Sequence, residues 1–538
     1  MRKLTSLIRL DREFSASVEA VLAEMKKSEP SAVVVNGLSG GAETAYVAEA
    51  AAILSEHSPL LIITGNESQR DKLAGVLTEC GLRARAFKSR DFVFHNVSAS
   101  HENERERLSV LRALIAGELD ALVATSDACI TPTVPYDILS RLFVSLRIGT
   151  EIAPSELCAR LASLGYARVE SVEAAGQFAA RGGIVDFCIN DGEAPIRVEF
   201  FGDEIDRMVS FDLLTQRAIA SVGEVELLPA IEVAETSETR KRVAAEIERL
   251  ISAAPDDNAR SALLREKNTV LGGGALDSRD RFINLIYEDA KTLLDYFSEF
   301  GGSAVMVVGT SESEERVKGR ASALAAEAES LLAGGLISKK HARYSIGYSE
   351  YSEFLTTHPT IHLNTFSGAA GASAMAGLFG FRCRRTVNYG GSPSMLIEDI
   401  KSLLKTGYRV IVASESKQGA TSVSDMLAGE GISYDLSLGD SPLGGALTVT
   451  DGALEGFDLI TPRVALLSMA EDSGRRIMQN RRRARILKRA GGAGERIMSY
   501  ADLSVGDYVV HANYGIGLFE GMESVRIDGV TKDYITIR

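Results

Sequence analysis

The chain has 538 residues, of which 45% are hydrophobic and 25% are charged. These values are typical of globular proteins and exclude a disordered or fibrous chain, and at about 150 residues per domain the length predicts three or four domains. Acidic residues outnumber basic ones by 73 to 59, which gives a net charge of −14. Such a balance excludes a bulk nucleic-acid binder, although a local basic patch can still bind nucleic acid.

The spacing of cysteines and histidines predicts neither a disulfide nor a metal centre. The five cysteines stand far apart without a C-x-x-C pair, which indicates a reducing compartment and no structural zinc. His358 and His362 are four residues apart, but Pro359 disfavours a helix between them, and in an extended strand this spacing spans about 13 Å. No window of 18 residues is uninterruptedly apolar. We therefore expect no signal peptide, no membrane span and a cytoplasmic protein.

Residues 1–143 alternate short apolar runs with amphipathic stretches. This alternation predicts a parallel sheet covered by helices on both faces. The expected strands are 31–35, 59–63 and 121–124, and the expected helices are 45–54, 68–80 and 102–116.

The pattern changes near Arg147 to one helix followed by several short strands with glycine-rich turns between them. Residues 144–222 are therefore expected to form a small antiparallel α+β domain, inserted between two pieces of a larger domain. The expected helix is 151–164 and the expected strands are 168–172, 176–180, 183–188, 196–201 and 207–212. Residues 223–340 return to helices, with one buried strand at 304–308, and supply the second piece.

A second α/β domain is expected over 351–470, with strands at 360–363, 409–413 and 459–461 and helices at 394–405 and 420–428. A connector follows over 471–499, where Arg475–Arg489 holds eight basic residues and no acidic one. We interpret it as a solvated interdomain helix, with contact to nucleic acid or an acidic partner as the alternative. Residues 500–538 alternate apolar and polar residues, which predicts a small β-barrel. The predicted fold class is thus a multidomain α/β protein with an incomplete barrel at its C-terminus.

Gly37 to Thr44 has the position and length of a phosphate loop, G-x-x-x-x-G-K-[ST], after a strand. The motif needs a glycine where Ala42 stands and a lysine for the β- and γ-phosphates where Glu43 stands. A carboxylate there repels a triphosphate, so we predict a non-functional loop. The nearest match to an acidic magnesium-binding motif, Gly202-Asp-Glu-Ile205, falls in a predicted hairpin. We therefore expect no catalytic residue, no metal and no cofactor in this chain.

Two segments have the character of protein-binding surfaces. Arg197, Glu199 and Phe201 share one face of a predicted strand, and Arg181 lies at a neighbouring turn. Two arginines and an aromatic ring are typical of an interaction hot spot, and a solvated face with ordinary cross-strand ion pairs is the alternative. At the C-terminus, 506–517 and 533–537 predict paired strands whose exposed edge could accept a partner strand, with a generic barrel as the alternative.

These segments resemble a known family. Residues 176–186, 197–206 and 227–230 are similar to the module shared by the bacterial excision-repair protein UvrB and the transcription-repair coupling factors. Residues 506–517 resemble the RNA-polymerase-interacting domain of the coupling factors, which also occurs in CarD-like regulators. Only coupling factors combine both, so the chain resembles their N-terminal portion. The domains implied are UvrB-like 1a at 1–143 and 1b at 223–340, the UvrA-binding domain 2 at 144–222, a spacer at 351–470 and a truncated polymerase-interacting domain at 500–538.

The resemblance also implies partners and site residues. UvrA would contact Arg181, Arg197 and Phe201, and the RNA polymerase β subunit would contact Tyr534, Ile535 and Ile537. ATP, Mg²⁺ and most DNA contacts would belong to translocase domains beyond Arg538, so we expect none of them here. The sequence departs from UvrB in lacking tyrosine over 87–108 and from coupling factors in Pro462-Arg463, where an acidic pair is usual.

Two other functions compete with this interpretation. A UvrB-like ATP-dependent repair enzyme would need a lysine at position 43, where the chain has Glu43. A CarD-like regulator with an extended N-terminus is disfavoured by the repair-type module. Within the coupling-factor interpretation, a chain ending at Arg538 leaves the strand at 534–537 without later partners. We therefore expect that strand to open readily and to bind polymerase poorly.

Overall fold

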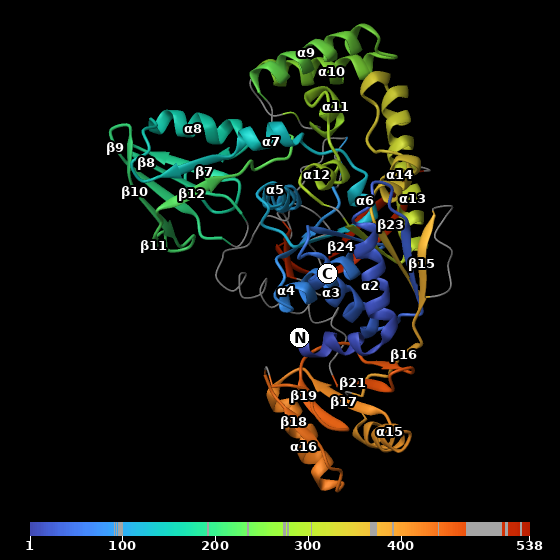
Figure 1. The fold of residues 1–538 in the computed structure, drawn as a ribbon. Helices are drawn as coiled ribbons and strands as arrows, with labels where there is room; N and C mark the ends of the chain where they lie inside the picture. The colour runs from blue at the N-terminus through green and yellow to red at the C-terminus, as the bar shows by residue number, and fades with distance from the viewer. Residues whose placement is uncertain are drawn as a thin grey trace.

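The computed structural model describes residues 1–469 and the strands of a small C-terminal sheet (Figure 1). The described residues have short gaps at 91, 93, 95–100, 191–192, 234–235, 273–275, 277–278, 303, 366–373, 390–391 and 440, and they resume at 508–511, 515–527 and 530–537. The expected basic connector at 471–499 lies outside the described residues.

A seven-stranded parallel sheet forms the body, in the order β15-β1-β14-β13-β2-β4-β3. Most of its inner strands are nearly continuous apolar runs because helices cover both faces. One face packs against α3 (Gly41–Leu54) and α4 (Glu67–Glu79), the other against α5 (Glu102–Ile115) and α13 (Thr310–Ala333). The strands include β1 (Ala32–Asn36), β2 (Leu60–Thr64), β3 (Ala84–Phe87), β4 (Ala121–Thr125) and β13 (Ala304–Val308). The expected α/β class with a large parallel sheet is confirmed.

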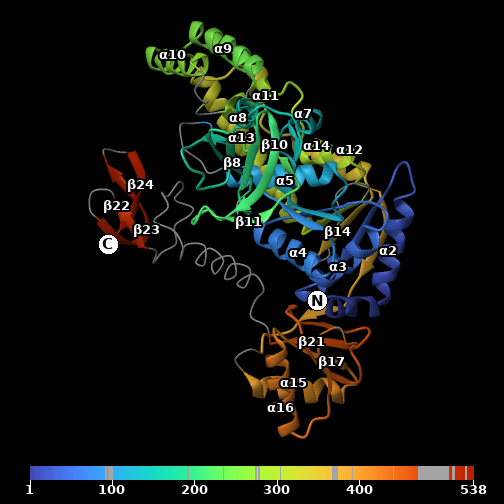
Figure 2. The ribbon, with the colours of Figure 1, turned by 90° about the vertical axis from the view of Figure 1, so that its left-hand side faces the viewer.

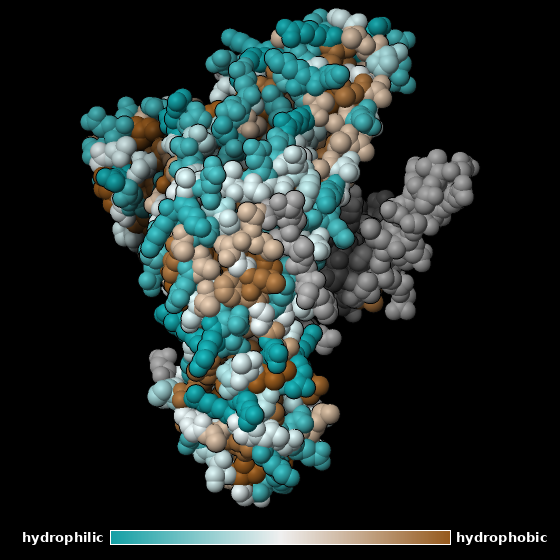
Figure 3. Space-filling view, turned by 45° about the vertical axis from the view of Figure 1, so that its right-hand side comes forward, coloured by the Kyte–Doolittle hydropathy of each residue, from teal (hydrophilic) through white to brown (hydrophobic). Residues whose placement is uncertain are grey.

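The predicted start of the second α/β domain is wrong. β14 (Thr360–Asn364) does not join it but lies between β1 and β13 in the large sheet, with Val34 opposite His362. β15 (Met375–Gly380) follows as the edge strand beside β1. A short strand of this composition can be buried in either sheet, and only non-local pairing decides between the two sheets. Met375 and Leu378 of β15 are exposed, and a hydrophobic area is visible on the side of the body that carries α2 (Arg12–Glu24) and β15 (Figure 3).

The second unit therefore begins near β16 (Cys383–Arg385) and extends to β21 (Val464–Ser468). Its six strands have the order β16-β20-β21-β17-β19-β18. α15 (Pro393–Lys405) and α16 (Lys417–Gly429) cover one face of this sheet. The other face packs against the body beside α3, and Figure 2 shows the unit below it. The remaining strands are β17 (Arg409–Ser414), β18 (Asp435–Ser437), β19 (Leu447–Asp451) and β20 (Phe457–Leu459).

A third sheet projects from the body and comes, in sequence, between β4 and β13 (Figure 1). Its order is β11-β10-β9-β8-β7-β6, and α8 (Pro154–Ser163) packs on one face. All strand pairs are antiparallel except β6 with β7, so the expected fully antiparallel sheet needs this correction. The strands are β6 (Ala167–Arg168), β7 (Gln177–Arg181), β8 (Ile184–Cys188), β9 (Ile196–Phe201), β10 (Glu204–Phe211) and β11 (Ala218–Ser221). The chain enters and leaves through a two-stranded sheet of β5 (Val144–Arg147) and β12 (Glu224–Leu227).

The C-terminal strands β22 (Tyr508–His511), β23 (Gly515–Ile527) and β24 (Val530–Ile537) form an antiparallel sheet in that order. A closed barrel stays a prediction. Across the described ranges, no helix combines the length and the apolar character that spanning a bilayer requires.

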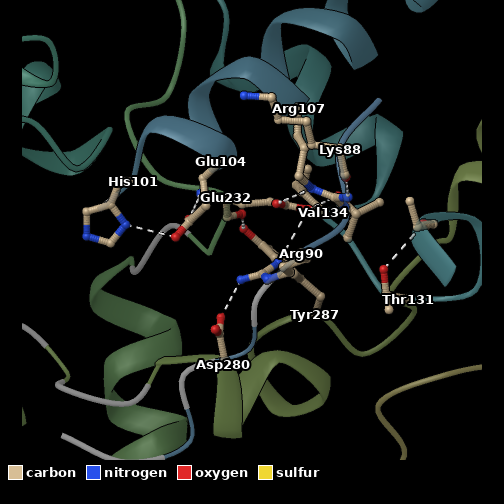
Figure 4. A network of polar contacts seen from close by, with 12 residues as sticks. Lys88, Arg90, His101, Glu104, Arg107, Thr131, Val134, Glu232, Asp280 and Tyr287 are labelled. Atoms are coloured by element: carbon tan, nitrogen blue, oxygen red, sulfur yellow. Dashed lines mark hydrogen bonds and ion pairs between the residues drawn. The ribbon is translucent and has the colours of Figure 1, made fainter. Parts of the chain in front are cut away.

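A buried cluster of charged residues joins the body to the point where the chain leaves the projecting sheet (Figure 4). The Glu232 carboxylate accepts two hydrogen bonds from Arg107, at 2.9 and 3.0 Å, and lies 3.3 Å from Arg90. Arg90 also pairs with Asp280, and Glu104 accepts the backbone amide of Glu232 at 2.7 Å. Because buried charges are stable only when paired, these contacts fix the four segments that supply them.

Replacing Arg107 with methionine should destabilise the protein by about 3–5 kcal/mol, because it leaves the buried Glu232 carboxylate underpaired. The matched control is Arg141→Met, which removes an exposed arginine 3.9 Å from Asp137 and should cost less than about 1 kcal/mol. The measurement is the free energy of urea unfolding of both variants. Equal values would mean that the buried pair does not hold the fold.

The same cluster predicts a loss of stability in acid. Burial acts to raise the pKa of Glu104, but the hydrogen bond from His101 and the charge of Arg90 outweigh it and lower the pKa to about 2 from 4.5. A carboxyl group with a lowered pKa stabilises the fold above its unfolded value, and this contribution disappears as the pH falls from about 4.5 towards about 2. The urea midpoint should therefore fall less steeply between about pH 5 and pH 3 in Glu104→Gln than in the unaltered chain. Parallel pH profiles would contradict this.

Candidate interaction face and phosphate-loop-like segment

The projecting sheet has one buried and one open face, and β9 shows the difference. Ile196, Val198 and Phe200 point to the core under α8, whereas Arg197, Glu199 and Phe201 lie on the outer face. Phe201 is 82% exposed. A single exposed apolar side chain is ordinary on a protein surface, so the neighbours of Phe201 decide whether this face can bind a partner.

The exposed residues gather at one end of the outer face. The turns at Gly182 and Gly202 lie at the same end of the sheet, and both glycines have positive φ, at 60° and 65°. Arg181 pairs with Ile184, which in turn pairs with Glu199 on β9. At the usual strand spacing, Arg181 and Glu199 are about 10 Å apart, and Phe201 is one step further along β9. We call Arg181, Ile184, Glu199, Phe201 and the neighbouring Arg207 the open end.

Arg197 is on the same face but has a different environment. Its Nε and Nη2 each donate to Asp186 at 2.8 Å, and its guanidinium lies 4.7 Å from the centre of the Phe211 ring. The hydrogen bond to Asp186 raises the pKa of Arg197. The side chain thus turns away from the open end and is committed to the fold. For this residue, the alternative of an ordinary cross-strand ion pair describes the geometry.

Arg181, in contrast, is exposed and donates from Nη2 to the Glu170 carbonyl at 2.6 Å. Sequence reasoning places Arg181, Arg197 and Phe201 on one surface, as the structure does, but it overlooks Asp186 and Ile184. Ile184 is 37% exposed and adds an apolar side chain to the open end. The strand register would have identified both residues, because it sets Asp186 opposite Arg197 and Ile184 opposite Glu199.

The phosphate-loop-like segment connects β1 to α3. Ala42 and Thr44 are buried, and Glu43 accepts a hydrogen bond from Gln69 Nε2 at 2.9 Å. Burial raises the pKa of Glu43, and Lys72 opposes that effect. Gly37 and Gly40 have positive φ, at 86° and 60°. A carboxyl group is either neutral or negatively charged, so Glu43 cannot neutralise phosphates as a lysine would.

The C-terminal candidates Tyr534, Ile535 and Ile537 lie on β24. They pair in register with Glu523, Met522 and Phe519 of β23. β24 is the last strand in the sheet order among the described strands. Their side chains lie outside the part of the chain that the structure describes.

The two spaced histidines do not meet at a common point. His362 is buried on β14 beside Thr310 Oγ1 at 3.2 Å, and burial lowers its pKa to about 4. His358 bonds instead to the Phe354 carbonyl at 2.9 Å. In the described residues, no three histidine, cysteine or acidic side chains are grouped as metal ligands would be.

Comparisons with known proteins agree with these two regions. Residues 144–232 match the UvrB interaction domain, and residues 503–538 match the CarD-like/TRCF RID domain. The chain is similar to the transcription-repair-coupling factors of Staphylococcus epidermidis (26% identity over 94% of the chain and 43% of the relative), Bacillus subtilis (24%, 100% and 45%) and Staphylococcus aureus (26%, 100% and 45%). It spans less than half the length of these relatives. The resemblance to the N-terminal portion of a transcription-repair-coupling factor is therefore confirmed.

The loop chemistry predicts that this chain does not bind Mg-ATP. Glu43 occupies the lysine position, and its carboxylate repels the phosphates in its ionised form. Isothermal titration of the full chain with Mg-ATP should give no heat of binding. Micromolar binding that disappears in Thr44→Ala would show that the loop still holds a nucleotide.

Proposed function

We propose that this chain is the recruitment arm of a transcription-repair-coupling factor, which links a stalled RNA polymerase to nucleotide-excision repair by binding UvrA and the polymerase β subunit. The observation that carries the proposal is the open end, where the 82% exposed Phe201 lies near Arg181 within the region similar to the UvrB interaction domain. No membrane partner is proposed. The five cysteines form no disulfide with one another, which suits a cytoplasmic protein.

The chemistry of the open end suits a partner with an apolar pocket and a carboxylate beside it. Phe201 and Ile184 are diagonal neighbours on adjacent strands and supply an apolar centre. Arg181 supplies charge-assisted hydrogen bonds at the rim. Arg197 supports this surface indirectly, because its bidentate bond to Asp186 holds β8 against β9.

The polymerase contact is proposed at β24, through Tyr534, Ile535 and Ile537. A strand at the edge of a sheet can bind a partner strand through main-chain hydrogen bonds. The similarity of 503–538 to the CarD-like/TRCF RID domain supports this assignment.

No catalytic residue is proposed within this chain. The ATP-dependent DNA translocase activity that the resemblance implies for a whole coupling factor is proposed to need ATP, Mg²⁺ and DNA contacts outside it. The competing function, a UvrB-like ATP-dependent enzyme, lacks support because Glu43 replaces the lysine that such an enzyme needs.

Removing the Phe201 ring should weaken UvrA binding by about 2 kcal/mol, or roughly thirtyfold, because the ring is the apolar centre of the proposed contact. Leu214→Ala is the matched control, since Leu214 is 66% exposed but follows the opposite end of β10, about 20 Å away along the strand. Arg181→Ala should cost about 1–3 kcal/mol. The association rate of the unaltered chain should fall as salt rises, and it should fall less steeply in Arg181→Ala. Surface-binding assays of the folded variants with purified UvrA measure these effects.

A variant of Arg197 distinguishes a loss of direct contact from a loss of stability in the same assay. Arg197→Ala should weaken binding and also lower the thermal midpoint, because it leaves the Asp186 carboxylate, 14% exposed, without its partner. Phe201→Ala should weaken binding alone. If the unaltered chain does not bind UvrA, or if Phe201→Ala and Leu214→Ala bind it equally well, this face is not the UvrA site.

A further inference from the structure

The phosphate-loop-like segment has glycines at positions 37, 40 and 41 but no lysine at position 43, and the structure shows what lies against these glycines. A Cβ atom on Gly37 would be 2.2 Å from the Phe381 carbonyl oxygen, and one on Gly41 would be 1.7 Å from that of Glu455. A Cβ atom on Gly40 would be 3.3 Å from the carbonyl oxygen of Gly456. The glycines therefore make room for main chain leading into and belonging to the second α/β unit.

Gly41 shows that close packing against the second unit, and not turn geometry alone, requires glycine in this segment. Gly37 and Gly40 have positive φ, which alone favours glycine, but Gly41 begins α3 and does not. Its lack of a side chain is explained by the close approach of Glu455. Neighbouring contacts join the same two parts, because the Phe381 amide donates to the Asn36 carbonyl at 2.9 Å.

Ion pairs and apolar packing on either side of the glycines enlarge the interface between the body and the second unit. The Glu455 carboxylate lies between Lys72, at 3.0 Å, and Arg385, at 2.5 Å. Lys3 of the N-terminal segment pairs with Asp451 at 3.0 Å. α3 is largely buried, and apart from Glu43 and Glu49 its side chains are mostly apolar. Phe457 and Leu459 of β20 belong to the same core as these side chains. A helix of that composition requires cover on every face.

We infer that the phosphate-loop-like segment is a docking cradle for the second unit. The main chain at Glu455–Phe457 occupies the space that the glycines leave open, and this joint locks the second unit to the seven-stranded sheet. The carbonyl groups and the Glu455 carboxylate bring electronegative atoms to the start of α3, where helix amides are unsatisfied. The cradle also excludes a nucleotide sterically. Restoring a lysine at position 43 therefore does not restore ATP binding.

The test compares two helical glycines in the full chain. Gly41→Ala adds a methyl group against the Glu455 carbonyl, whereas Gly319→Ala adds one on α13 where nothing lies within 4 Å. Amide hydrogen exchange over 379–386 and 452–460 should become about ten- to a hundredfold faster in Gly41→Ala, because overpacking forces the second unit away from the loop. It should not change in Gly319→Ala. Equal exchange in the two variants overturns the proposal.

A milder pair of variants covers the case in which Gly41→Ala does not fold. Lys72→Met removes a partner of Glu455 at the joint, and Lys401→Met removes an exposed partner of Glu430 at 3.1 Å. Only Lys72→Met should speed exchange over 452–460. In Glu43→Lys, calorimetry should still detect no Mg-ATP binding. Unchanged exchange in Lys72→Met, or ATP binding by Glu43→Lys, contradicts the cradle.

Discussion

The Glu232 carboxylate is the buried charge on which the arrangement of the projecting sheet depends. It follows β12, where the chain leaves that sheet, and it is neutralised by Arg107 of α5 and by Arg90. Because an unpaired carboxylate could not stay buried there, the chain can leave the sheet only along a path that brings Glu232 to both arginines. The open end thus projects from a base that three parts of the chain hold in place: α5, the segment that contains Arg90, and the segment that contains Asp280.

A different constraint fixes the second unit. α3 lies between the large sheet and the second unit, and it buries alanine, valine and tyrosine side chains around its whole circumference. Such a helix has no face for solvent, so a unit that covers it is a condition of its stability. The two constraints act on opposite sides of the body. One holds an interaction face outward, and the other closes a surface that would otherwise resemble a nucleotide site.

Local patterns predict much of this fold, and non-local pairing limits the rest. The strand at 196–201 is predicted to the residue, since alternating apolar side chains and a Gly-Asp turn define it. The place of β14 is not predicted, because the sequence Thr-Ile-His-Leu at 360–363 suits a buried strand in either sheet, and only the pairing with β1 assigns it to the large sheet. The candidate interaction face is likewise predicted in part by local pattern and in part only by non-local pairing. Strand alternation places Phe201 outside, but only the register shows that Asp186 engages Arg197.

The engagement of Arg197 changes how a loss of binding at this residue is to be understood. Two of the five N–H donors of Arg197 bond to Asp186 and a third reaches the Gln216 carbonyl at 3.4 Å, so this arginine can give a partner only its two other donors and its exposed surface. Its replacement frees Asp186, places an unpaired negative charge on the open face and loosens β8 against β9. Each effect weakens binding to an acidic partner without any direct contact. A loss of binding on replacing Phe201 or Arg181 therefore identifies a contact residue. The same loss on replacing Arg197 does not, because the main partner of Arg197 belongs to its own chain.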